Sequence, residues 1–278
     1  MSVDFQNEAF NKYFFEIYGE RWPQIYESLK NKEKQTQRRN SFFDLDTETD
    51  AAEKVSEFYA MDPASIYVAQ ALDVQPEDLV LDMCAAPGGK TLILAEALKS
   101  TGSLTSNEFS NTRRERLLRV VREYIPYPLR QNIFVTGKDG NMFGKNFSET
   151  FDKILADVPC SGERHLLENK DEFLKWTKRR SENLAVRQFS LLSSAYIACK
   201  TNGTIVYSTC SISPIENDHV IKKLIKRRSV EILQPEFLKT NTDVEKTEFG
   251  YQVLPDKTGF GPMYFAVLKK SSDSTAII

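Results

Sequence analysis

Two cysteines each follow a short apolar segment in the second half of the chain. Cys160 comes after Ile154-Leu-Ala-Asp-Val-Pro, in which Asp157 precedes the Pro-Cys pair, and Cys210 comes after Thr204-Ile-Val-Tyr-Ser-Thr. A single cysteine is usually a small buried apolar residue, but residues at the carboxyl ends of strands in an open α/β sheet meet at one edge. We therefore expect two thiols and a carboxylate to share one site.

A thiolate beside an acid suits addition to a pyrimidine ring. Carbon 5 of a pyrimidine is not nucleophilic by itself, so methylation there requires prior attack of a thiolate at carbon 6. With a reference pKa of about 8.5, only a small part of a thiol is ionised at neutral pH, so the site has to activate it. An acid near ring nitrogen 3 would stabilise the charge that develops, which is the role we expect for Asp157. A base in a nucleic acid would also have to be flipped out of its stack.

A third segment has the pattern of a loop that binds a nucleotide-like cofactor. The apolar run Leu79-Val-Leu-Asp leads into Met-Cys-Ala-Ala-Pro-Gly-Gly-Lys-Thr and then into a helical pattern. Gly88 and Gly89 let a ligand approach the backbone, Pro87 fixes the turn, and the helix supplies N-terminal amides. A carboxylate for ribose hydroxyls is expected about 20 residues onward, at the end of the next strand, and Glu108 stands there.

Two other nucleotide-binding motifs share part of this pattern, but this sequence lacks a glycine that each of them requires. The dinucleotide fingerprint GxGxxG does not occur here. The phosphate loop GxxxxGK[ST] matches at Gly89-Lys90-Thr91, but Cys84 stands where its first glycine is required. A phosphate-loop ATPase and a strand-to-helix turn without a ligand stay open as alternatives on this pattern.

Strands and helices that would position these loops alternate from residue 61 onward. Strands are expected at 79–83, 103–108, 132–135, 153–157 and 204–208, and helices at 90–99, 112–124, 182–199 and 214–228. Short apolar strands covered on both faces are typical of a parallel sheet. The last pair, 251–254 and 263–268, leaves no room for a helix between its members, so it predicts an antiparallel hairpin at the sheet edge. The fold class is α/β.

The N-terminal part of the chain has a different pattern of apolar and charged residues. Aromatic and apolar residues at helical spacing over 5–30, with a break at Trp22-Pro23, predict two amphipathic helices. A basic and polar stretch over 32–40 and an acidic one over 44–57 read as a solvated linker. We predict that residues 1–58 form a helical extension with an acidic linker and that residues 59–278 form a catalytic domain.

Composition excludes several classes of protein. The 278 residues are 41% apolar and contain no apolar run near the ~18 residues that cross a bilayer, so a disordered chain and a membrane-spanning one are excluded. Four cysteines without CxxC spacing and only two histidines argue against a disulfide framework and against a metal site. A net charge of −2 gives no global positive field, so nucleic acid would bind local patches, for which 175–187, around Trp176, and 222–228 are candidates. The first ten residues show no leader pattern, which favours the bacterial cytoplasm, or a mitochondrion for a processed form.

The motifs resemble those of the Fmu/Sun family of RNA (cytosine-5)-methyltransferases, which use S-adenosylmethionine. Asp-Met-Cys-Ala-Ala-Pro-Gly-Gly-Lys, Asp-Val-Pro-Cys-Ser and Tyr-Ser-Thr-Cys-Ser occur in the family's order between Tyr59 and Lys269, after an entry helix at Met61-Asp-Pro-Ala-Ser65. Gly19-Glu-Arg-Trp-Pro23 and Gly261-Pro-Met-Tyr-Phe265 are similar to the short mitochondrial ribosomal-RNA branch. The resemblance implies a class I methyltransferase with a Rossmann-like, mostly parallel seven-stranded sheet. It also implies methylation of cytidine at carbon 5 in RNA, most of all ribosomal RNA, with tRNA as the alternative.

The same resemblance implies a role for each candidate residue. Cys210 becomes the nucleophile that attacks carbon 6, Cys160 assists release of the methylated product, and Asp157 faces both cofactor and cytosine. Glu108, which replaces the aspartate usual there, holds the ribose with Arg113 nearby. The resemblance also implies that the cofactor is bound by the loop residues Cys84, Ala85, Pro87, Gly88, Gly89 and Lys90, of which the last three hold its methionine part. The adenine is expected to bind Asp139 and Gly140.

Two further alternatives accompany this hypothesis. A DNA cytosine methyltransferase uses a Pro-Cys nucleophile, which would move that role to Cys160. A methyltransferase fold retained as an RNA-binding ribosome assembly factor, with secondary or no catalysis, would not need either thiol. No appended RNA-binding domain is recognised, so RNA docking would use the N-terminal helices, surface patches or a partner protein. Neither a membrane nor a metal is expected as a partner.

Overall fold

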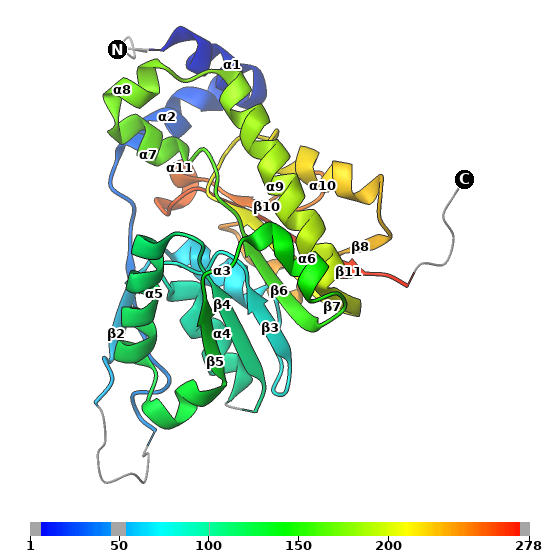
Figure 1. Ribbon diagram of the computed structural model, residues 1–278. Coiled ribbons are helices and arrows are strands. Elements are labelled where there is room, and N and C mark those ends of the chain that lie inside the picture. The colour runs from blue at the N-terminus through cyan, green and yellow to red at the C-terminus, as the bar shows by residue number, and fades with distance from the viewer. Residues whose placement is uncertain (1–6, 46–53, 100, 273–278) are drawn as a thin grey trace.

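The computed structural model describes residues 7–45, 54–99 and 101–272 (Figure 1). Within these ranges the main sheet has nine strands, eight of them in one continuous order, with β8 (Val230–Leu233) beside β11. That order is β5 (Ile133–Thr136), β4 (Ser103–Asn107), β3 (Leu79–Asp82), β6 (Phe151–Asp157), β7 (Cys199–Thr209), β11 (Met263–Lys270), β10 (Tyr251–Val253), β9 (Glu245–Lys246).

The parallel part of the sheet confirms the α/β prediction. The five strands from β5 to β7 lie where short apolar runs predicted them, and all four of their pairings are parallel. β7 begins earlier than expected, at Cys199. The sheet contains the seven strands expected for a methyltransferase, from β5 to β7 with β11 and β8, and β10 and β9 extend it.

The C-terminal hairpin is antiparallel as predicted, but its place at the sheet edge was wrong. β11 lies between β7 on one side and β8 and β10 on the other, all antiparallel to it. Its residues 263–268 are all buried, because an unbroken apolar run suits an interior strand rather than an edge. A one-turn helix, α11 (Pro255–Thr258), also fits into the connection judged too short for a helix, since it begins with a proline and needs only four residues.

Helices cover both faces of the sheet and enclose two apolar cores. One face carries α3 (Pro63–Gln70), α4 (Gly89–Leu98) and α5 (Asn111–Tyr124), and the other carries α6 (Phe143–Asn146), α9 (Lys178–Ala198) and α10 (Asp218–Ile225). The helix expected over 214–228 is shorter because residues 214–217 form hydrogen-bonded turns before α10 begins.

The N-terminal extension is helical, as predicted. It consists of α1 (Glu8–Tyr18), the 3₁₀ turn η1 (Gly19–Arg21) and α2 (Trp22–Lys30), in which Pro23 occupies the first turn. These helices pack with α7 (Glu163–Glu168) and α8 (Lys170–Leu174) around a third apolar core rich in aromatic side chains. Figure 1 shows the four helices gathered at one end of the molecule.

Part of the expected linker is ordered structure. Residues Thr36–Arg39 form β1, which pairs antiparallel with β2 (Phe58–Met61). The prediction of a solvated linker failed there because a polar strand in a two-stranded sheet has no apolar alternation to reveal it. Residues 46–53 of the acidic stretch lie outside the described residues, and the division of the chain at residue 58 stays a prediction. Among the helices described, none combines the length and apolar character needed to cross a membrane.

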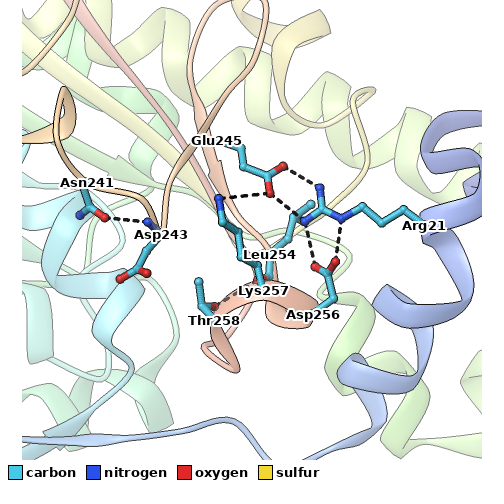
Figure 2. A network of polar contacts seen from close by, with 8 residues as sticks. All are labelled: Arg21, Asn241, Asp243, Glu245, Leu254, Asp256, Lys257 and Thr258. Atoms are coloured by element: carbon cyan, nitrogen blue, oxygen red, sulfur yellow. Dashed lines mark hydrogen bonds and ion pairs between the residues drawn. The ribbon is translucent and has the colours of Figure 1, made fainter.

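A single arginine ties the N-terminal helices to the C-terminal part of the sheet (Figure 2). The Arg21 guanidinium donates to both oxygens of Glu245, at 2.7 and 2.8 Å, and to Asp256 Oδ2 at 2.6 Å. Glu245 lies in β9 and Asp256 in α11, so two paired carboxylates from different elements share one guanidinium. Such bidentate ion pairs are stronger than single surface ion pairs because their geometry is fixed.

Replacing Arg21 with alanine is expected to lower the free energy of unfolding by about 1–2 kcal/mol, because it leaves the largely buried Asp256 without this partner. For a chain of this size we expect a fall in Tm of about 3–6 °C. Lys30→Ala is the control, since it removes an exposed ion pair with Glu27 and should change stability by less than about 0.5 kcal/mol. Equal Tm values for the two variants would contradict a stabilising role for Arg21.

Candidate active site

The cofactor loop and both cysteine loops meet at the carboxyl edge of the parallel strands. Cys84 follows β3, Asp157 ends β6 and Cys210 follows β7, and these strands are neighbours in the sheet. A cleft of about 660 Å³ opens at this edge. Seven of the predicted site residues line it: Cys84, Pro87, Lys90, Arg113, Asp157, Cys160 and Cys210.

The glycine turn after β3 has the backbone conformation that its sequence predicts. Gly88 has φ +120°, which only glycine adopts readily, and it caps α4, which begins at Gly89. A Cβ atom at Gly88 would lie 2.9 Å from Val120, and one at Gly89 would lie 2.8 Å from the ring of Tyr59. Ala85 and Gly89 line a smaller pocket that shares Lys90 and Asp157 with the cleft.

Two buried carboxylates beside this turn each keep one oxygen without a hydrogen bond among the described residues, Asp82 Oδ1 and Glu108 Oε2. Asp82 Oδ2 accepts from Thr91 Oγ1 at 2.7 Å, and burial raises the pKa of Asp82 to about 7. Glu108 Oε1 accepts from the Ser110 amide at 2.9 Å, and Glu108 Oε2 lies 3.4 Å from Arg113 Nη1. These oxygens can accept from a bound ligand that carries hydroxyl or ammonium donors.

An ion pair stands between the cofactor loop and the cysteine loops. Lys90 Nζ lies 2.8 Å from Asp157 Oδ2, and Ser208 Oγ donates to Asp157 Oδ1 at 2.7 Å. Burial opposes the charge of Lys90, but the adjacent Asp157 carboxylate outweighs it and raises the pKa of Lys90. The cleft therefore holds a fixed ammonium and a fixed carboxylate side by side.

The two thiols are neighbours. The backbone N–H of Cys210 donates to Cys160 Sγ at 3.2 Å. A hydrogen bond with the Cys210 side chain and burial raise the pKa of the Cys160 thiol well above its usual value, so this thiol keeps its proton at neutral pH. Gly162, in the left-handed region at φ +59°, passes close to the second thiol, since a Cβ there would lie 3.6 Å from Cys210 Sγ.

A buried acidic network that the sequence analysis did not identify joins the two cysteine loops. Glu163 Oε1 accepts from Ser161 Oγ at 2.5 Å and from Ser211 Oγ at 2.9 Å, and Glu163 Oε2 accepts from the Ile212 amide at 3.0 Å. Glu216 Oε2 accepts from the Ser161 amide at 2.9 Å. Both glutamates are fully buried, and each follows a cysteine within a serine-containing loop, which is the signal that could have found them.

The stability of the protein should depend on pH through Glu163. Burial and the nearby Glu216 raise the pKa of Glu163 from 4.5 to about 7. A carboxyl with a raised pKa binds its proton more tightly in the folded chain, so stability falls as pH rises from about 4.5 through about 7. Glu163→Gln removes this titration. The difference in unfolding free energy by which wild type exceeds the variant should therefore be smaller at pH ~8 than at pH ~5, by on the order of 2 kcal/mol.

Urea unfolding of both proteins at the two pH values measures this change. Glu168→Gln is the matched control, because Glu168 lies in the same helix with its side chain 67% exposed. We expect the control to follow wild type at both pH values. A Glu163→Gln deficit that stays constant with pH would contradict the raised pKa.

Four residues that were predicted to bind the cofactor line neither the cleft nor the smaller pocket in the part of the chain that the structure describes. They are Gly88, Glu108, Asp139 and Gly140. Gly88 caps α4, and Glu108 directly follows β4. Asp139 uses its side chain to cap η3 (Gly140–Met142), and the Gly140 carbonyl accepts from Ser194 Oγ. The adenine roles of Asp139 and Gly140 stay predictions.

The surface patches proposed for RNA differ from expectation in one respect. Trp176 is only 2% exposed and packs against Phe10 and Tyr13, so it offers no stacking surface, and this part of the prediction was wrong. The Trp is buried because the third apolar core forms around it. In the second patch, Lys223 and Arg227 both lie over the ring of Phe189.

Comparison with known proteins identifies the family. A profile described as "16S rRNA methyltransferase RsmB/F" matches residues 69–269, well over half of the chain. The chain belongs to the RsmB/F family. This membership confirms the resemblance read from the three motifs, and it makes S-adenosylmethionine the cofactor.

Curated relatives carry RNA methyltransferase names. The bovine protein named 5-cytosine rRNA methyltransferase NSUN4 is 37% identical over 228 residues, covering 75% of this chain and 58% of its own. A zebrafish protein named tRNA (cytosine(34)-C(5))-methyltransferase, mitochondrial, is 35% identical, and the match covers 78% of this chain and 61% of the relative. Ribosomal RNA small subunit methyltransferase F of Cronobacter sakazakii is 33% identical, and the match covers 78% of this chain and 45% of the relative. The RsmB/F chain thus spans less than two thirds of the length of these relatives.

A solved structure shows the same fold. The structure titled as a methyltransferase homolog protein from Pyrococcus horikoshii aligns with a TM-score of 0.71 and 23% identity, and the alignment covers 94% of each chain. At this identity the likeness concerns the fold alone.

The two carboxylate oxygens without a hydrogen bond beside the glycine turn fit this cofactor. S-adenosylmethionine carries an ammonium group and two ribose hydroxyls, which can donate hydrogen bonds to Asp82 Oδ1 and to Glu108 Oε2, the second of which is already in an ion pair with Arg113. Gly88, Gly89 and Lys90 would hold its methionine end, and Glu108 with Arg113 its ribose. When bound, the cofactor supplies an electrophilic methyl group.

Proposed function

We propose that this RsmB/F-family protein methylates carbon 5 of a cytidine in RNA, with S-adenosylmethionine as the methyl donor. The observation that carries the proposal is the pair of adjacent thiols, Cys160 and Cys210, in the cleft that also holds the Lys90–Asp157 ion pair. The names of the relatives support ribosomal RNA as the substrate, with tRNA as the other class.

The first step forms a covalent bond between Cys210 and the base. The Cys210 thiolate attacks carbon 6 of the flipped cytosine, a bond between sulfur and carbon forms, and the electron pair of the C5–C6 double bond moves toward carbon 4 and nitrogen 3. Asp157 can accept a hydrogen bond from the amino group on carbon 4, next to nitrogen 3, and the Lys90 ammonium stabilises the negative charge, because both groups are already fixed in the cleft. Carbon 5 is then nucleophilic enough to accept the methyl group.

The second step releases the product. The proton on carbon 5 leaves to solvent, the electron pair of the C5–H bond restores the C5–C6 double bond, and the pair of the sulfur–carbon bond returns to Cys210. Cys160 lies beside that sulfur with a retained proton, which supports a role in protonating the departing Cys210. No part of this scheme assigns Cys160 to the attack.

RNA docking needs surface beyond the cleft, on this chain or on a partner protein. The exposed His165 at the rim of the cleft and the basic residues near the start of α9 support docking on this chain. Relatives from bacteria and from mitochondria support either the bacterial cytoplasm or a mitochondrion as the place of action.

Bisulfite sequencing tests the proposal. Purified protein is incubated with S-adenosylmethionine and, separately, with ribosomal RNA, tRNA and single-stranded DNA. We expect protected cytidines in ribosomal RNA that are missing with Cys210→Ala. Protection in tRNA alone would change the proposed substrate, and protection in DNA alone would favour the DNA enzyme. Binding of RNA without protection in any pool would contradict catalysis and favour the assembly factor.

A further inference from the structure

The N-terminal helix α1 makes direct hydrogen bonds to the loop that carries Cys210. Tyr18 donates its hydroxyl to the carbonyl oxygen of Ile212 at 2.7 Å, and the Tyr13 hydroxyl lies 2.8 Å from Ser213 Oγ. Burial raises the pKa of Tyr13 to about 12 and that of Tyr18 further, so both hydroxyls keep their protons. Two tyrosines of the extension thus bond to the residues that follow Cys210.

Apolar packing fixes the position of these hydroxyls. Ile212 is 2% exposed and belongs to the third core, which α1 and α2 build. The Tyr18 ring stacks on Phe14 and on Trp22, with centroid distances of 6.5 and 6.4 Å. Because these rings interlock in a buried cluster, Tyr18 has little freedom to move away from the loop.

The Cys160 loop is tied to the same N-terminal segment. Arg164, two residues beyond Gly162 and nearly buried, donates to the carbonyl of Asn31 and to that of Phe260. Glu33, shortly after Asn31, lines the cleft itself. Residues 7–33 therefore contact both cysteine loops.

The nucleophile needs such support because the sheet does not hold it. β7 ends at Thr209, so Cys210 is the first residue outside the strand, and its amide bonds to Cys160 Sγ and not to a neighbouring strand. Glu163 and Asn217 of the catalytic domain bond to residues 211 and 212 of this loop, and the two tyrosines of the extension bond to residues 212 and 213. A shift of about 1 Å in an attacking atom can cost on the order of a hundredfold in rate.

We propose that Tyr18, assisted by Tyr13, is a positioning residue that holds the Cys210 thiol at the distance required for attack on carbon 6. The inference rests on the proposed function. The N-terminal extension is then a part of the active site and not only a surface for RNA.

The test measures the attack step with and without the tyrosine hydroxyl. Cys160→Ala serves as the parent, because we expect it to accumulate the covalent RNA adduct, and Tyr18→Phe is added to it. Loss of one buried hydrogen bond is expected to slow adduct formation, and kcat in the Cys160-containing enzyme, by about five- to tenfold. The dissociation constant for S-adenosylmethionine and the KM for RNA should stay within about twofold, because Tyr18 does not line the cleft and its hydroxyl bonds to Ile212.

Tyr67→Phe is the matched control. Tyr67 also donates a long-range hydroxyl bond, to Asp243 Oδ2 at 2.9 Å, but that bond does not involve a cysteine loop. The inference is overturned if Tyr18→Phe forms adduct as fast as the parent. It is also overturned if Tyr18→Phe lowers the affinity for the cofactor as much as the rate of adduct formation. The same holds if Tyr18→Phe slows adduct formation no more than Tyr67→Phe does, because both results indicate general destabilisation. A parent that forms neither adduct nor methylated RNA overturns the attack by Cys210 itself, which is distinct from the other results. If the parent turns over without adduct, only the release role of Cys160 is overturned, and the decrease in kcat of Tyr18→Phe in the Cys160-containing enzyme then decides the inference.

Discussion

Cys210→Ala is expected to reduce methyl transfer to RNA by at least about a thousandfold, because the variant lacks the sulfur that makes carbon 5 nucleophilic. Binding of S-adenosylmethionine should persist, since the residues proposed to hold the cofactor come from the loop after β3 and from the ends of β4 and β5. Transfer of tritium from labelled S-adenosylmethionine to RNA measures the first quantity, and titration calorimetry measures the second.

The control for this variant is Cys199→Ala. Cys199 is fully buried at the start of β7, at the opposite end of the strand from Cys210, so its loss should affect stability more than chemistry. Methyl transfer by Cys210→Ala within about tenfold of wild type would contradict its role as nucleophile.

The second large effect is expected from Cys160→Ala, which should convert a catalyst into a protein that traps its substrate. In the proposed mechanism attack by Cys210 does not need the Cys160 sulfur, whereas release does, so the covalent complex with RNA should accumulate to a large part of the protein present. A denaturing gel with labelled RNA would show it as a band of higher mass. Wild type should show little of this band at the same time point.

Two outcomes would contradict the release role of Cys160. Normal turnover without a trapped complex would make this thiol dispensable. Complete inactivity without a trapped complex would transfer the nucleophile to Cys160, as in the DNA enzyme that the Pro-Cys pair also suggested.

The sequence predicted those parts of the fold whose residues carry a local pattern. The strands β3, β4 and β6 alternate with helices along the chain, and β3 and β6 end on aspartates that lead into loops with a cysteine, so the parallel arrangement and the common edge could be predicted from the sequence. β11 was misplaced at the edge because its partner β8 is a short strand of ordinary composition that no pattern marks.

The candidate site was predicted only where a loop follows a strand directly. Cys160, Cys210 and Asp157 could be placed together for this reason. Glu163 could not, since a buried glutamate in α7 looks like any surface glutamate until the serines and the Ile212 amide that bond to it are seen. Tyr18 could not either, because its bond to Ile212 joins residues at opposite ends of the sequence.

The most direct test of the account is the identity of the cysteine in the trapped complex. Cys160→Ala protein is incubated with substrate RNA and S-adenosylmethionine, digested with nuclease and protease, and examined by mass spectrometry. The peptide that contains Cys210 should carry the mass of a methylated cytidine nucleotide. If the nucleotide is found on another cysteine, the covalent mechanism through Cys210 is wrong.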